Sequence, residues 1–184
     1  MIYHTNMEQI KSLFFSNTLK RWHFEDIVRT SKISRERVNH YLKLLLKQKF
    51  IIKIKPNEKM PYFIANKESE SFRIEKRMNG LKLIQESGLF EHINSLKDVK
   101  TAMLFGSFAR GDWNNSSDID LFIYGNCKNF EKGLFELKTG REIQLFNYHN
   151  TEGIKKLDVK LIPNIVKGFN IKGSLEPFKV YIND

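Results

Sequence analysis

The spacing of apolar residues changes from helical to extended within the first 66 residues, and this change narrows the possible folds more than any other feature. Up to residue 49 the apolar residues recur at the three- and four-residue spacing of a buried helix face. From residue 51 they fall into two short runs, 51–55 and 60–64, which Pro56-Asn57-Glu58-Lys59 separates. Three apolar groups have this helical spacing: Met7, Ile10, Leu13 and Phe14; then Phe24, Ile27 and Val28; then Val38, Tyr41, Leu42 and Leu45. A turn at 30–33 separates the second group from the third, and Ser34 is the expected N-cap of the third helix. We therefore expect helix, helix, turn, helix and hairpin.

This order is that of a winged helix-turn-helix domain, which we predict for residues 1–66. Residues 5–66 resemble, in pattern only, the winged-helix domains of bacterial and archaeal transcription regulators. Arginine and asparagine make bidentate contacts to base edges, and lysines contact phosphates. We expect double-stranded DNA as the partner, and protein interaction is the alternative use of such a domain. The expected DNA-binding residues are Arg35, Asn39, His40 and Lys43 on the third helix and Lys53 and Lys55 on the hairpin.

Positive charge is concentrated in this first part of the chain. The formal net charge is +10, and residues 1–66, with 13 Lys and Arg against 5 Asp and Glu, carry +8 of it. A local positive field favours a polyanionic partner, because each neutralised phosphate releases condensed counterions. A basic surface that only aids solubility is the alternative.

The rest of the chain alternates helical and extended patterns, so the predicted fold class is α+β. Residues 67–96 read as a connector helix, and its apolar side would carry Phe72, Ile74, Met78, Leu81 and Ile84. Residues 97–184 read as a small α/β domain with a mixed sheet. The expected strands are 99–105, 118–124 and 142–148, with a short helix between the last two and another helix over 151–167.

The motif Phe105-Gly106-Ser107-Phe108-Ala109-Arg110-Gly111 ends the first of these strands. Glycine lets the backbone approach a ligand closely, and free N–H groups at a helix start suit phosphate. Asp118 and Asp120 follow on the next strand and, being two apart, point to one face. Paired carboxylates of this kind bind Mg²⁺, which shares its coordination with substrate phosphates. The glycine-serine turn and the aspartate pair are each weak evidence when taken alone, whereas their order along the chain predicts a nucleotide-binding site.

This joint order resembles the active-site signature of the DNA polymerase beta superfamily, most closely its minimal nucleotidyltransferase branch, from about residue 97 to 173. The resemblance implies that Gly106 and Ser107 hold the triphosphate and that Asp118 and Asp120 carry the metals. Arg110 would contact phosphate or brace the loop. The resemblance also leaves open a protein partner of the toxin–antitoxin type and a homodimer.

The third carboxylate of active members is missing from its usual position. In minimal nucleotidyltransferases the sequence around this position resembles the pattern Gly-Arg-x-apolar-Asp. The corresponding segment here is Gly140-Arg141-Glu142-Ile143-Gln144, which has a glutamine at the last position. Glutamine cannot act as a base. Glu142 lies on the same face and is the candidate third catalytic residue, with a solvent-facing role as its alternative.

We therefore expect a Mg²⁺-dependent transferase of nucleoside monophosphates to a hydroxyl. The alternative is a DNA-binding transcriptional regulator whose degenerate second domain binds nucleotide or a partner without catalysis. The single Cys127 excludes an internal disulfide, the five histidines lack metal-ligand spacing, and no signal peptide or membrane span is visible, so we expect a cytoplasmic protein.

Overall fold

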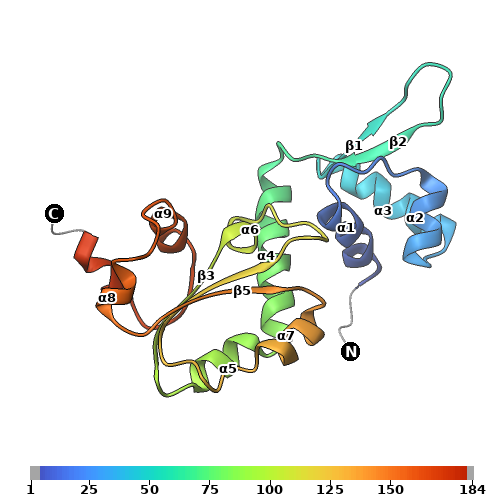
Figure 1. Ribbon diagram of the computed structural model, residues 1–184. Coiled ribbons are helices and arrows are strands. Elements are labelled where there is room, and N and C mark those ends of the chain that lie inside the picture. The colour runs from blue at the N-terminus through green and yellow to red at the C-terminus, as the bar shows by residue number, and fades with distance from the viewer. Residues whose placement is uncertain (1–4, 182–184) are drawn as a thin grey trace. The chain divides into compact units, whose positions relative to one another are not determined.

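The computed structural model describes residues 5–181, and the chain divides into two compact units between Lys76 and Arg77. The division lies inside helix α4 (Glu70–Glu86), so each unit contains part of that helix (Figure 1). The domain boundaries expected at residues 66 and 96 stay predictions. None of the helices in residues 5–181 has the length and apolar character that a bilayer crossing needs.

The first unit contains helices followed by a hairpin. Strands β1 and β2 pair antiparallel, with Ile51 opposite Ala65. An isolated antiparallel bridge joins Trp22, which precedes the second helix, to Phe63 in β2. The chain order is α1 (Asn6–Ser16), α2 (Phe24–Ser31), α3 (Arg35–Lys47), β1 (Ile51–Ile54), β2 (Tyr62–Ala65) and the start of α4. The core residues of this unit include Ile10, Phe14, Ile27, Val38, Leu42, Leu45, Phe50 and Phe72.

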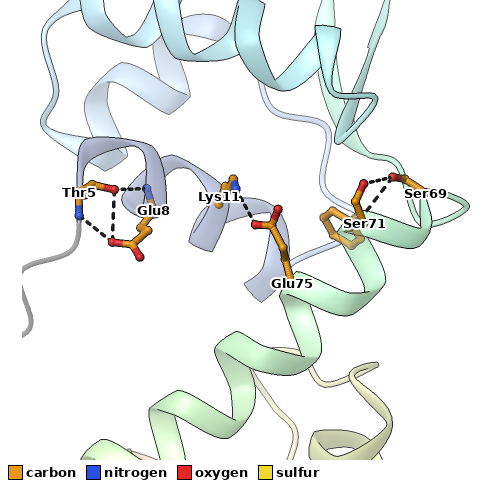
Figure 2. Close-up of polar contacts among 7 residues, drawn as sticks. Thr5, Glu8, Lys11, Ser69, Ser71 and Glu75 are labelled. Atoms are coloured by element: carbon orange, nitrogen blue, oxygen red, sulfur yellow. Dashed lines mark hydrogen bonds and ion pairs between the residues drawn. The ribbon is translucent and has the colours of Figure 1, made fainter.

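Helix α1 begins with a reciprocal cap, drawn in Figure 2. The Thr5 hydroxyl accepts a hydrogen bond from the Glu8 backbone N–H, and the Glu8 carboxylate accepts one from the Thr5 N–H. Such a capping box satisfies N–H groups that a helix start otherwise leaves unpaired. Further along α1, Lys11 forms an ion pair with Glu75 of α4, so the first turns of α4 are tied to this unit.

The second unit is built on a sheet with strand order β5-β4-β3-β6. Strands β4 and β5 pair in parallel, whereas β3 pairs antiparallel with both β4 and β6, so the predicted mixed sheet is confirmed. Its elements are α5 (Leu89–Ser95), β3 (Val99–Phe105), α6 (Gly106–Arg110), β4 (Ile119–Gly125), α7 (Lys132–Thr139), β5 (Ile143–Tyr148), α8 (Thr151–Ile154), α9 (Ile162–Val166), β6 (Phe169–Lys172) and the 3₁₀ helix η1 (Glu176–Tyr181).

One sheet face carries Met103, Phe105 and Phe122, and side chains from the C-terminal segment pack against it. Those side chains are Ile154, Leu157, Ile165 and Phe178. Asp120 is two residues before Phe122 in β4, so its side chain points to this same face. The carboxylate therefore lies beside a packed apolar core.

Two predicted helices are broken in the structure. The connector expected over 67–96 ends at Glu86 and restarts as α5 after Gly88, whose φ of +81° favours glycine. Ile74 and Met78, expected on its apolar side, are exposed. The helix expected over 151–167 is instead α8 and α9. Pro163 lies in the first turn of α9, because proline lacks an N–H group and is tolerated at a helix start rather than inside a helix.

Candidate functional site

The turn from β3 into α6 brings the backbone against an aspartate. Gly106 begins α6 with φ +68°, and the preceding Phe105 is in register with Asp120 of β4. A Cβ atom on Gly106 would lie only 1.8 Å from Oδ2 of Asp120. The carboxylate of Asp120 therefore packs on the backbone of the Gly106–Ser107 turn, in space that only glycine leaves open.

Asp118 and Asp120 form a pair of partly buried acids. Asp120 lies in β4, whereas Asp118 lies in the loop just before the strand. The pKa of Asp120 is raised, first by burial and then by the nearby Asp118 carboxylate, while the Arg110 guanidinium acts in the opposite direction. Among the described residues, none donates a hydrogen bond or an ion pair to either carboxylate. The two negative charges thus lie close together, and the charges of Arg110 and Arg141 act on them without forming an ion pair.

These two carboxylates fit Mg²⁺ by their chemistry. Mg²⁺ prefers oxygen ligands and is usually held by one or two carboxylates together with substrate phosphates. Burial and then repulsion from Asp118 raise the pKa of Asp120, and a divalent cation would offset that repulsion. Within the described part of the chain, no group of three or more His, Cys, Asp or Glu residues is placed to hold a metal ion. The fit therefore rests on the two aspartates.

Strand β5 places Gln144 directly beside Asp120. The parallel register pairs Asp120 with Gln144 and Ile119 with Ile143. Glu142 precedes the strand, its carbonyl accepts a hydrogen bond from the Ile119 N–H at 2.8 Å, and its side chain is exposed. The neutral Gln144 is thus the neighbour of Asp120, and the catalytic role of Glu142 stays a prediction.

Ser107 and Arg110 lie on α6, close to the aspartates. The Ser107 carbonyl accepts hydrogen bonds from the N–H groups of Gly111 and Asp112, which closes the short helix. Arg110 forms an exposed ion pair with Asp112, at 3.2 Å between Nε and Oδ2. Arg110 thus pairs with the first part of the loop, and its charge opposes the rise in the pKa of Asp120. The phosphate-binding roles of Gly106, Ser107 and Arg110 stay predictions.

Arg141 is a residue that sequence reasoning did not single out. Its Nη1 donates to the carbonyl oxygens of Asn114 and Ser117, each at 2.8 Å, in the loop that leads to Asp118. Burial lowers the pKa of Arg141, and Asp118 opposes that shift. The only signal in the sequence was its place in the Gly-Arg pattern before β5, which does not reveal contacts with a loop more than 20 residues away.

The residues predicted to bind DNA lie in the first unit, and all of them are exposed. Arg35 is the first residue of α3, where it pairs with Glu25 of α2 and lies over the Phe24 ring. Asn39, His40 and Lys43 follow on α3, Lys53 lies in β1, and Lys55 comes just after it. The structure thus presents these side chains to solvent, and their contacts with DNA stay a prediction.

Known proteins resemble parts of this chain. Over 47 residues the chain is 43% identical to a Methanocaldococcus jannaschii protein named "Putative protein adenylyltransferase", a match that covers 23% of this chain and 47% of that protein. The chain thus spans about half the length of this relative. The chain also resembles a chain of a crystal structure described as a toxin-antitoxin with AMP-PNP, with 14% sequence identity and a TM-score of 0.37. The match covers 52% of this chain and 79% of that chain.

A family model described as "Nucleotidyltransferase domain" matches residues 87–181, just over half of the chain. The matched segment runs from the residue before Gly88 to the end of η1, and so includes the Gly106 turn, both aspartates and strand β5. The chain therefore belongs to the nucleotidyltransferase domain family.

Proposed function

We propose that this protein transfers a nucleoside monophosphate from a nucleoside triphosphate to a hydroxyl group, with Mg²⁺ held by Asp118 and Asp120. The observation that carries the proposal is the packing of the Asp120 carboxylate on the Gly106 turn, with Asp118 close enough to raise its pKa. A phosphate chain bound at the turn would thereby meet two acids that have no hydrogen-bond or ion-pair partner among residues 5–181. Family membership supports the same reaction class.

In the proposed reaction the acceptor oxygen bonds to the α-phosphorus, and the bond from that phosphorus to the bridging oxygen of the β-phosphate breaks. Pyrophosphate leaves, and the hydroxyl proton passes to water because Gln144 cannot accept it. The Gly106 and Ser107 N–H groups and the Ser107 hydroxyl would orient the phosphates, and the Arg110 guanidinium would offset their charge. Bound Mg²⁺ supplies charge neutralisation at the phosphate oxygens.

ATP is the donor we propose, with a protein hydroxyl as the acceptor. The support is the name of the M. jannaschii relative, a protein adenylyltransferase, together with the family match. Incubating the full chain with each α-labelled nucleoside triphosphate, Mg²⁺ and cell extract tests both choices. Label that passes from ATP to protein and is stable to denaturation supports them. Absence of transfer from every triphosphate would contradict the proposal.

Gln144 favours a second candidate function, a regulator that binds nucleotide without transferring it. The variant Gln144→Asp distinguishes the two functions, because it places a carboxylate beside Asp120. A general base contributes about 100- to 10,000-fold to a rate, so we expect transfer to rise at least about tenfold. Initial rates with labelled ATP measure the gain, and Gln144→Asn, which is shortened equally but neutral, is the matched control. Transfer that appears only in Gln144→Asp would assign the regulator function to the natural chain.

We further propose that the first unit is a winged helix that binds duplex DNA. Its helices and hairpin follow each other in the order such a domain requires, and the Trp22–Phe63 bridge adds an extended segment to the hairpin. The exposed side of α3 carries Arg35, Asn39 and Lys43, residue types that suit base edges and phosphates.

Arg35→Ala combined with Lys43→Ala is expected to weaken duplex binding at least about tenfold at low salt, because two cationic contacts are lost. The slope of log affinity against log salt should fall by roughly 2, which mobility shifts at several salt concentrations measure. Arg29→Ala with Lys67→Ala removes the same charge from other exposed positions and serves as the control. Glu25→Gln should strengthen binding, since it releases Arg35 from its ion pair. Equal weakening by both double variants would leave α3 without a specific role.

A further inference from the structure

Asp118 and Asp120 are held in place by different parts of the fold. Asp120 lies within β4, where the ladder fixes it between Phe105 of β3 and Gln144 of β5. Asp118 precedes the first residue of that strand and belongs to the loop between α6 and β4. A site that needs both carboxylates therefore needs something other than the sheet to hold this loop.

Residues 114–117 of this loop are shaped by hydrogen bonds among themselves. Asn114 and Ser117 bond to each other, from the Asn114 N–H to the Ser117 hydroxyl at 2.9 Å and from the Ser117 N–H to the Asn114 carbonyl at 3.2 Å. The Asn114 side-chain oxygen accepts from the N–H and the hydroxyl of Ser116. These bonds shape the turn, but they do not attach it to the rest of the unit.

Arg141 makes that attachment from another element. Its Nη1 lies 2.8 Å from the carbonyl oxygens of both Asn114 and Ser117 and 3.4 Å from that of Asn115. The Ser117 carbonyl belongs to the peptide that joins Ser117 to Asp118, so this bond acts one residue from the acid. Charge-assisted hydrogen bonds of this type are stronger than neutral ones.

The guanidinium of Arg141 is itself fixed in position. It lies 4.9 Å from the ring centre of Phe108 and 5.5 Å from that of Trp113, and these buried rings stack in parallel. A planar guanidinium stacks on aromatic faces in a way that an ammonium does not. The backbone N–H of Arg141 also donates a hydrogen bond to the carbonyl oxygen of Glu136, in the last turn of α7. Arg141 lies just before the start of β5. Side chain and main chain thus both hold Arg141 still.

We propose that Arg141 is the positioning residue that holds the Asn114–Ser117 loop, and with it Asp118, in register with Asp120 for binding a divalent cation. This inference rests on the proposed function for its purpose, but the holding of the loop can be measured without any activity. In this role Arg141 acts through Asp118, by holding the carbonyl oxygens of the loop that precedes it. Its loss therefore acts on cation binding only while Asp118 is present.

Arg141→Met keeps the length of the aliphatic stem but removes the donors and the charge. We expect the amides of Ser116, Ser117 and Asp118 to exchange hydrogen at least about tenfold faster, while amides in the β3–β4 ladder stay protected. Mn²⁺ affinity of the full chain, measured by the paramagnetic signal of free Mn²⁺, should fall about 10- to 100-fold, as for other residues that orient a metal ligand. Arg141→Lys keeps the positive charge on a shorter side chain, so we expect a smaller loss of Mn²⁺ affinity than in Arg141→Met.

Two further variants isolate the effect. In an Asp118→Asn background, Arg141→Met should cause no additional loss of Mn²⁺ affinity, because both changes remove the same ligand. Lys138→Met removes one positive charge from the end of α7, where Lys138 lies over the Phe135 ring, and should leave both measurements unchanged. Unchanged loop exchange in Arg141→Met, faster exchange throughout the unit, or Mn²⁺ losses that add in the double variant would each overturn the proposal. If the natural chain binds no Mn²⁺, the proposed function fails, and the exchange measurement still decides the role of Arg141.

Discussion

Replacing Asp118 and Asp120 by asparagine is expected to abolish nucleotide transfer while leaving the protein folded. Charge stabilisation by a bound metal contributes several kcal/mol to such a reaction, which corresponds to a loss of at least about 100-fold in rate. Transfer of label from α-labelled ATP to protein measures the loss. Transfer that persists in the double variant would place the reaction elsewhere in the chain.

The stability of the same double variant provides its control. Because the pKa of Asp120 is raised in the folded protein, folding disfavours its charged form at neutral pH. Asparagine removes that penalty, so the metal-free melting temperature should stay level or rise. The gain should be below about 1 kcal/mol, since the carboxylate is partly exposed and solvent screens it. The gain is present above the raised pKa and disappears as the pH falls below the ordinary range of aspartate. A lower melting temperature at neutral pH would contradict this reading of Asp120.

Gly106→Ala is expected to damage both the fold and the site. The new methyl group would fall 1.8 Å from Oδ2 of Asp120, so the carboxylate or the turn has to move. A residue with a Cβ at φ +68° also carries backbone strain of about 1 kcal/mol, and the forced displacement adds roughly 1–3 kcal/mol. A displacement of about 1 Å at a catalytic group can cost 100-fold in rate, so we expect transfer to fall by at least that factor.

Gly140→Ala is the matched control for Gly106→Ala. Gly140 has nearly the same φ, +65°, but a Cβ there would meet nothing within 4 Å. Thermal melts of the two variants therefore separate backbone strain, which both share, from the collision with Asp120, which only Gly106→Ala suffers. Equal melting temperatures and equal transfer rates in the two variants would show that the Asp120 carboxylate does not pack on the turn.

Local patterns predicted the elements of the site well. The strand predicted over 99–105 is β3, with the same bounds. A short apolar run that ends at a glycine is typical of a buried strand. The two-residue spacing of Asp118 and Asp120 predicted a shared face, and the raised pKa of Asp120 is consistent with their proximity. The glutamine beside Asp120 also followed from the sequence once the register of β5 was assumed.

Features that depend on distant parts of the chain were not predicted. Strand β6 was missed because Phe169–Lys172 is short and gains its hydrogen bonds from β3, far back in the sequence. Arg141 was missed for the same reason, since its partners lie in a loop 24 to 27 residues earlier. The break at Pro163 had a local signal, and the continuous helix predicted over 151–167 was wrong in ignoring it.

The placement of Gln144 has an evolutionary consequence. Strand β5 is an edge of its sheet, and Gln144 is exposed on it, so a change of side chain there disturbs little of the core. A glutamine codon becomes a glutamate codon by a single-base change. Natural selection can therefore add or remove an acid next to Asp120 almost independently of folding. Under the proposed function, such a change would move descendants of this chain between transferring a nucleotide and only binding it, while the fold persists.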